Sequence, residues 1–173
     1  MHRLLLLLAG LAFLALPAAA TARPEQHPAP PGFLVVRNAS ADGGVAGDPV
    51  ATVVVRGFVI GRIALEGAVE VYHLSGSQPA QATGVDVSRH AVYWRTVRGT
   101  EFTGSGFRFR AVGGVWRVVV YGAGVSLYAG GESSSITLHG SVGIPGDDGE
   151  YSINGGPFVS LPAGVVKPRL EAK

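Results

Sequence analysis

The chain has 173 residues, no cysteine and a formal net charge of +2, and 47% of its residues are hydrophobic. So small an excess of positive charge does not indicate bulk polycation binding, which argues against nucleic acid or a membrane surface as a partner. Without cysteine, disulfides cannot stabilise an exported domain, so its stability must come from a hydrophobic core that a chain of this length can build.

The N-terminal residues have the pattern of a targeting segment. Arg3 supplies a positive start, an apolar run extends from Leu4 to Leu16, and Ala20-Thr21-Ala22 fits an A-x-A cleavage site. We therefore expect a signal peptide over 1–22 and a product that is secreted, or periplasmic and associated with the cell envelope. The apolar run is too short to span a membrane comfortably, so no membrane span is expected after signal cleavage. The excess of arginine over lysine is typical of a GC-rich bacterial genome.

A proline-rich spacer over 23–32 precedes the predicted domain, which extends over 33–161. Residues 33–37 form the first expected strand, and residues 38–49 form a loop. From 50 to 74, apolar residues occur at every second position, and this alternation is longer than is usual for a single strand. The glycines within this stretch, Gly57, Gly61 and Gly67, are the expected positions of bends, bulges or a tight reversal.

A loop is expected over 75–84, followed by strands over 85–87 and 91–97. From 107 to 140, apolar and polar residues alternate without losing phase, which predicts a meander of antiparallel strands. We place two-residue loops at Gly113-Gly114 and Gly122-Ala123, and a four-residue loop from Gly131 to Ser134. The buried face of this meander then collects Phe107, Phe109, Trp116, Val118, Val120, Val125, Leu127, Ile136 and Leu138.

A last hairpin is expected around the Asn154-Gly155-Gly156 turn, and residues 162–173 are expected to form a flexible tail. No segment has helical periodicity over a full helix length. The sequence therefore predicts an all-β domain, an antiparallel β-sandwich or closed β-barrel of about nine to ten short strands. A parallel β-solenoid is disfavoured because the hairpin signals do not fit it.

The polar face of the predicted meander carries the candidate ligand-binding residues. In the predicted register Arg110 lies opposite Arg117 with Arg108 beside them, which is unfavourable unless solvent, a carboxylate such as Glu101 or Glu132, or an anionic ligand offsets the repulsion. Aromatic and imidazole side chains on the same face suit a polyanion or a sugar. The set is Arg108, Arg110, Arg117, Tyr121, Tyr128 and His139. The alternative interpretation is an ordinary solvated sheet face.

The signals for metal binding and catalysis are weak. Asp147, Asp148 and Glu150 cluster carboxylates that could hold a cation, although Asp-Gly pairs are ordinary turn formers. The histidines lack zinc-ligand spacing, and no nucleophile elbow or dinucleotide-binding loop is present. A carboxylate pair could be drawn from Glu66, Glu70, Glu101 or Asp86, so a hydrolase of unrecognised type stays a lesser alternative.

These observations favour an exported, non-catalytic β-domain with a structural or interaction role, which needs no cofactor. The expected partner is a cell-envelope polymer or another protein. The alternative function is a carbohydrate- or polyanion-binding module that uses the arginine and tyrosine face. The sequence does not indicate the oligomeric state.

Overall fold

The computed structural model describes residues 32–41, 47–76, 78–140 and 149–170. The predicted signal peptide and all but the last residue of the predicted spacer lie outside these residues. The strands are β1 (Gly32–Ala39), β2 (Ala51–Ile63), β3 (Glu66–Gly76), β4 (Gln81–Thr83), β5 (Ser88–Trp94), β6 (Val97–Ser105), β7 (Arg108–Gly122), β8 (Val125–Gly140), β9 (Glu150–Ile153), β10 (Val159–Ser160) and β11 (Gly164–Val166). Among the described residues, no helix is long and apolar enough to cross a membrane.

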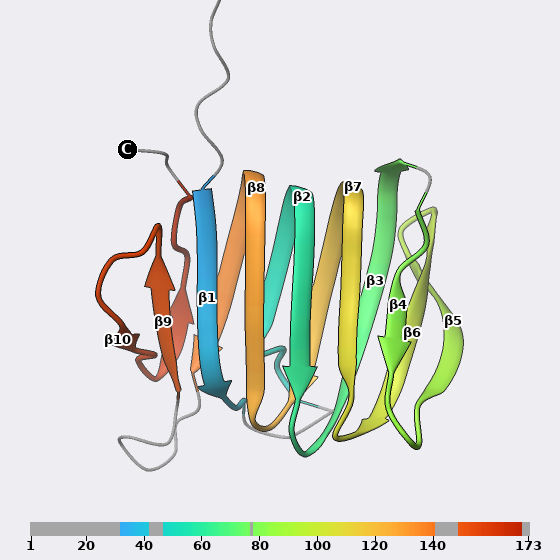
Figure 1. Ribbon diagram of the computed structural model, residues 1–173, viewed down its shortest axis with the longest axis horizontal. Helices are drawn as coiled ribbons and strands as arrows, with labels where there is room; N and C mark the ends of the chain where they lie inside the picture. Colours follow the sequence, from blue (N-terminus) through green and yellow to red (C-terminus); the bar gives the residue numbers. More distant parts are fainter. Residues whose placement is uncertain (1–31, 42–46, 77, 141–148, 171–173) are drawn as a thin grey trace, which may run out of the picture.

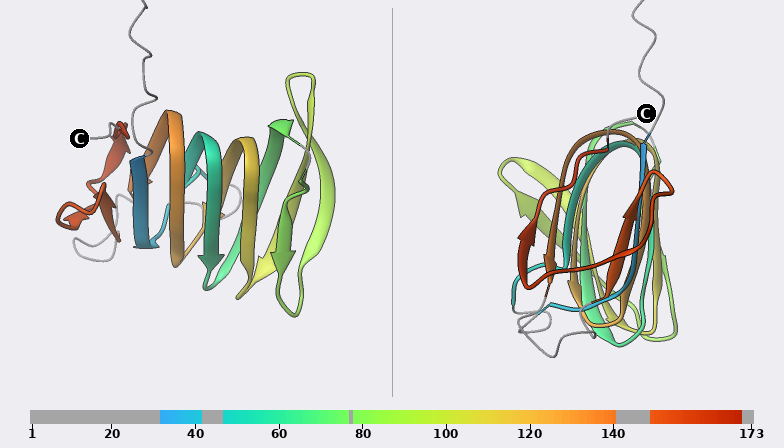
Figure 2. Two further views of the ribbon diagram at one scale, coloured as in Figure 1. Left: turned by 45° about the horizontal axis from the view of Figure 1, so that its top comes forward. Right: turned by 90° about the vertical axis from the view of Figure 1, so that its left-hand side faces the viewer.

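The all-β prediction is confirmed, and the strands form one antiparallel sheet. Its order is β10-β9-β1-β8-β2-β7-β3-β6-β5, with β11 added to β8 and β4 added to β7. Because this order has two ends, the sheet is not closed, and the barrel alternative does not apply. The sheet folds over on itself into two layers that pack face to face (Figures 1 and 2).

Three long strands, β2, β7 and β8, contribute to both layers. Their halves 58–63, 108–112 and 125–130 lie in a front layer with β1, β9 and β4. The other halves, 51–56, 114–122 and 133–140, lie in a back layer with β3, β6, β5 and β11. Each long strand passes from one layer to the other at the top of the molecule in Figure 1.

The strands bend where glycines face one another. Gly57 of β2 pairs with Gly114 of β7 on one side and with Gly131 of β8 on the other. A Cβ on Gly57 would collide with the Gly130 carbonyl oxygen, and its φ of 153° is one that other residues rarely adopt. The bend therefore depends on the absence of side chains along this line.

Extra residues accompany the bends. The register between β2 and β7 shifts because Gly113, with φ of 76°, has no partner between Val112 and Gly114. The register between β2 and β8 shifts in the same way at Ser134. One extra residue in one strand is a β-bulge, which bends the strand and increases its twist.

The predicted hairpins of the meander are wrong in detail. Residues 113–114 and 131–134 lie inside continuous strands, so these loops do not exist. The chain does reverse at Gly122-Ala123, but the reversal joins the back layer to the front layer. Strand β2 lies between β7 and β8 in both layers, so Val118 pairs with Val53 and Leu127 with Gly61. The predicted hairpin with its loop at Gly122-Ala123 would have paired Val118 with Leu127, and this pairing does not occur.

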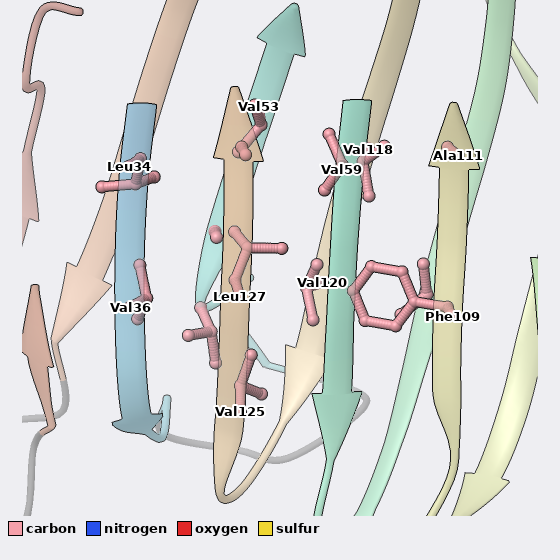
Figure 3. Close-up of a cluster of buried hydrophobic side chains, with 14 of the residues drawn as sticks. Leu34, Val36, Val53, Val59, Phe109, Ala111, Val118, Val120, Val125 and Leu127 are labelled. Atoms are coloured by element: carbon pink, nitrogen blue, oxygen red, sulfur yellow. The ribbon is translucent and has the colours of Figure 1, made fainter. Parts of the chain in front are cut away.

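The predicted buried face is nevertheless confirmed. A β-bulge at Gly113 and the predicted two-residue loop both move the buried residues from odd to even positions, so both structures bury the same side chains. All nine residues that the pattern placed on it are at most 2% exposed. They pack between the layers with the apolar residues of β1, β2 and β3, as Figure 3 shows for Val59, Phe109 and Val120. The core therefore lies between the two layers along their whole length.

Other segments differ from expectation. Residues 85–87 form no strand, and Val85 is 96% exposed. The strand expected over 91–97 is interrupted by a turn at Arg95 and Thr96, which joins β5 to β6. The hairpin around Asn154 is present as β9 and β10. The expected tail is not loose over its described part, because β11 pairs with β8 and Leu170 packs against the core.

Candidate functional site

The outer surface of the front layer brings together half of the predicted ligand-binding residues. Arg108, Arg110 and Tyr128 all point outward from this layer, and all three are exposed. Arg110 pairs with Ile60, and Ile60 pairs with Tyr128, so these side chains form one row across β7, β2 and β8. We call this outer surface the front face.

A like-charged pair lies at one edge of the front face. Arg62 of β2 is the direct partner of Arg108 of β7, and both side chains are exposed. Like charges directly opposite each other destabilise an antiparallel pair. The segments of β1, β8, β2, β7 and β4 that build the face contain no Asp or Glu. No carboxylate within these segments therefore offsets the repulsion.

Aromatic side chains occupy the middle of the front face. Phe33 and Phe58 both pack edge-on against Tyr128, with ring centroids at 6.0 Å and 5.1 Å. Tyr128 is 42% exposed and Ile60 is 44% exposed, so the cluster is accessible. An aromatic surface beside arginines can contact an apolar or sugar-like body while the guanidinium groups bind its anionic groups.

Arg117, Tyr121 and His139 lie elsewhere. They belong to the halves of β7 and β8 in the back layer, on its outer surface, so the six predicted residues do not form one site. Arg117 pairs with Val54 and Tyr72, and the predicted pairing of Arg117 with Arg110 is wrong. The bend at Gly113 is the physical reason, because it carries the second half of β7 to the other layer.

Arg117 is packed into an aromatic cluster. Its guanidinium carbon lies 4.7 Å from the ring centroid of Trp94 and 5.3 Å from that of Tyr72. The Tyr72 hydroxyl donates a 2.8 Å hydrogen bond to Glu70. Burial, followed by the hydrogen bond and charge of Glu70, raises the pKa of Tyr72 well above its ordinary value. These contacts fit a structural role for Arg117, which covers the outside of the back layer.

Glu132, one of the two carboxylates expected to offset the arginines, forms a different ion pair. Its carboxylate lies 3.5 Å from Nε of Arg56, at the bend between the layers. The side chains are 56% and 67% exposed, so this pair stabilises the fold little. Glu132 therefore does not neutralise Arg108 or Arg110.

Asp147 and Asp148 of the predicted cation site lie outside the described residues. Glu150 begins β9 and is exposed. Within the described ranges, no group of three or more histidine, aspartate or glutamate side chains could hold a metal ion.

Two of the carboxylates considered for catalysis share a surface hollow. Glu66 and Asp86 line it together with Ser88, Thr103 and Ser105. Both acidic side chains are exposed. A catalytic acid usually depends on burial or on a close charged partner, and this hollow provides little burial.

No family model, curated protein or solved structure matches the chain. The chemistry of the front face therefore has to be argued from its own residues. Sequence reasoning missed Arg62, Phe58 and Ile60, although the alternation over 50–74 already placed Arg62 on the polar side. The missing information was that β2 pairs with β7 and β8.

Proposed function

We propose that the protein is an exported, non-catalytic β-domain whose front face binds an anionic polymer of the cell envelope. The observation that carries the proposal is the direct pairing of Arg62 with Arg108 on a face where the segments of β1, β8, β2, β7 and β4 contain no carboxylate. Sulfate, phosphate or carboxylate groups of a polymer would neutralise this pair. Guanidinium groups bind such oxyanions with two parallel hydrogen bonds.

The row formed by Arg110, Ile60 and Tyr128 favours a polymer over a small ion as the ligand of the front face. It extends across three strands, and neighbouring strands lie about 4.8 Å apart, so the row is long enough for more than one repeat of an extended chain. The aromatic cluster beside it offers a surface for the apolar faces of sugar rings.

Chromatography on immobilised dextran sulfate tests the proposal, with uncharged dextran as the reference matrix. The double variant Arg62→Ser/Arg108→Ser should lose most of its retention on dextran sulfate, and the remaining retention should depend less on salt. Tyr128→Ala should weaken retention without changing its salt dependence.

The matched control removes two positive charges elsewhere. Arg95 and Lys167 are both exposed and lie outside the front face. Arg95 has a φ of 55°, so asparagine is the suitable replacement, and the control is Arg95→Asn/Lys167→Ser. If this control loses as much retention as Arg62→Ser/Arg108→Ser, binding follows net charge and the proposed face is wrong.

Export depends on the N-terminal pattern and has a separate test. Mass spectrometry of protein recovered from the medium or periplasm should show a chain that begins at Arg23. A chain that retains its leader inside the cell would contradict the proposed location.

A further inference from the structure

The two layers do not have the same width at the end where β5 lies. The front layer ends at β4, whereas the back layer continues through β3, β6 and β5 (Figure 1). The inward-pointing residues of β5 are consequently exposed, as Arg89, Ala91 and Tyr93 show. The interior of the fold opens to solvent at this end.

Two hollows lie side by side in this opening. The first, of about 300 Å³, lies against His73, Arg89, Arg98, Thr100 and Trp116. The second, of about 400 Å³, lies against Ala82, Val87, Arg89 and Phe102. They share Pro79, Ala80 and Arg89, so we treat them as one end pocket with two halves.

The first half contains a buried donor without a partner. Trp116 is 1% exposed, and its indole Nε1 has no hydrogen-bond partner in the described part of the chain. Burying an N–H group without an acceptor is unfavourable, and most buried polar groups are paired. An acceptor oxygen of a ligand in this half would satisfy the indole if the side chains that cover Nε1 shift slightly, because the atom itself is buried.

His73 holds the indole in place. The two rings are stacked, with centroids 4.2 Å apart and planes 15° from parallel. A Cβ on Gly76 or Gly114 would lie 2.6 Å or 2.9 Å from Nε2 of His73, so the imidazole is wedged against the glycine bend. The position of the donor is thus fixed before any ligand binds.

The charge of the first half is positive. Arg89 and Arg98 line it, Thr100 adds a hydroxyl group, and none of its lining residues is acidic. The second half has a mixed lining, in which Val87, Ala82 and Phe102 supply the apolar side chains. The Arg89 guanidinium carbon lies 5.6 Å from the Phe102 ring centroid, so Arg89 stands at the boundary between the halves.

We propose that the end pocket binds a small organic oxyanion, a carboxylate or a phosphate monoester, with an apolar body. The anionic head would lie between Arg98, Arg89 and the indole N–H of Trp116. The body would lie against Phe102 and Val87. The site is separate from the front face, and the proposal does not depend on polymer binding. The volumes fit a ligand about as large as a substituted aromatic ring.

Indole N–H resonances provide the test, because the chain has only two tryptophans. The Trp94→Phe variant assigns the two signals. Phenylacetate and phenyl phosphate should shift the Trp116 signal in a saturable way, whereas the neutral phenylacetamide should not. Acetate should bind more weakly than phenylacetate because it is too short to reach Phe102 and Val87. The order of phenylacetate and phenyl phosphate then identifies the preferred head group.

Arg98→Gln should weaken phenylacetate binding roughly tenfold, because it removes a charged hydrogen-bond donor. Arg95→Asn removes a nearby charge outside the pocket and should leave binding unchanged. Arg62→Ser/Arg108→Ser should also bind phenylacetate normally, which separates this proposal from the front face. A Trp116 signal that does not move, that moves equally with phenylacetamide, or that responds equally in Arg98→Gln would overturn the proposal.

Discussion

Arg62 and Arg108 lie directly opposite each other on β2 and β7, and both are exposed on the front face, where the segments of β1, β8, β2, β7 and β4 contain no carboxylate. Two positive charges in this position are unfavourable for the folded protein when no anion is bound. Residues that destabilise a fold and remain accessible are expected where a ligand supplies the missing interaction. This relationship leads to the first prediction.

Arg108→Ser should increase the free energy of unfolding at low ionic strength by up to about 0.5 kcal/mol, because it removes a like-charged cross-strand pair. The gain should disappear at high salt, where the charges are screened. Urea denaturation at two salt concentrations measures the effect. Arg110→Ser is the control, because the partners of Arg110 are Ile60 and Gln81, which carry no charge. An equal, salt-dependent gain in this control would contradict the explanation.

Gly57→Ala should destabilise the fold by more than about 2 kcal/mol, because the new Cβ collides with the backbone of Gly130 and strains the bend. Gly106→Ala separates the two causes. Gly106 also has a positive φ, of 62°, but a Cβ there would meet no atom within 4 Å. It should therefore cost only the backbone strain, about 1–2 kcal/mol. Thermal unfolding of both variants provides the comparison. Equal losses of stability would argue against a close approach between Gly57 and the backbone of Gly130.

The absence of cysteine allows the topology to be tested by crosslinking. Thr52 and Thr137 are direct partners on β2 and β8, so Thr52→Cys/Thr137→Cys should form a disulfide under mild oxidation. Arg117→Cys/Tyr128→Cys should not, because these residues lie in opposite layers. A simple hairpin of β7 and β8 would instead place Arg117 opposite Tyr128 and allow this second disulfide to form. Non-reducing mass analysis after proteolysis distinguishes the outcomes.

Tyr72 predicts a loss of stability at alkaline pH. Its pKa is raised above the ordinary 10.0, chiefly by burial, so the neutral form is favoured in the folded state. In the unfolded chain the hydroxyl ionises near pH 10, and the folded state then binds more protons than the unfolded state. Stability should therefore be unaffected below that pH and should decrease as the pH rises above it.

Tyr72→Phe should reduce this alkaline loss, although it also removes the hydrogen bond to Glu70. The pKa of Tyr121 is also raised, mainly by burial and then by the charge of Glu70, so part of the loss should remain. Chemical denaturation over a pH series compares Tyr72→Phe with the unaltered protein. An unchanged slope in Tyr72→Phe would show that Tyr72 does not carry the effect.

Much of the core could be predicted from the sequence because strand periodicity reports burial directly. Phe109 and Trp116 were both assigned to the interior although the chain between them was misinterpreted. A bulge at Gly113 and a two-residue loop at Gly113-Gly114 both shift the parity of the buried residues by one position. The pattern of residues 107–140 is therefore the same for a meander and for bent strands. Only the pairing with β2, more than forty residues earlier in the chain, separates the two.

The candidate site was partly predictable for the same reason. Arg108, Arg110 and Tyr128 share a face as the alternation predicted, because all three lie before the bends in their strands. Arg117 and His139 follow the bends and are carried to the other layer. The end pocket could not be predicted, because it depends on the front layer ending at β4 while the back layer continues through β6 and β5.

The passage of β2, β7 and β8 through both layers has a consequence for how the protein opens. A sandwich built from two independent sheets can lose one sheet and keep the other partly ordered. Here the two layers share three strands, so neither layer can detach without disrupting β2, β7 and β8 in the other. Amide protons at the two ends of β2 should consequently exchange with one common protection energy, equal to that of global unfolding.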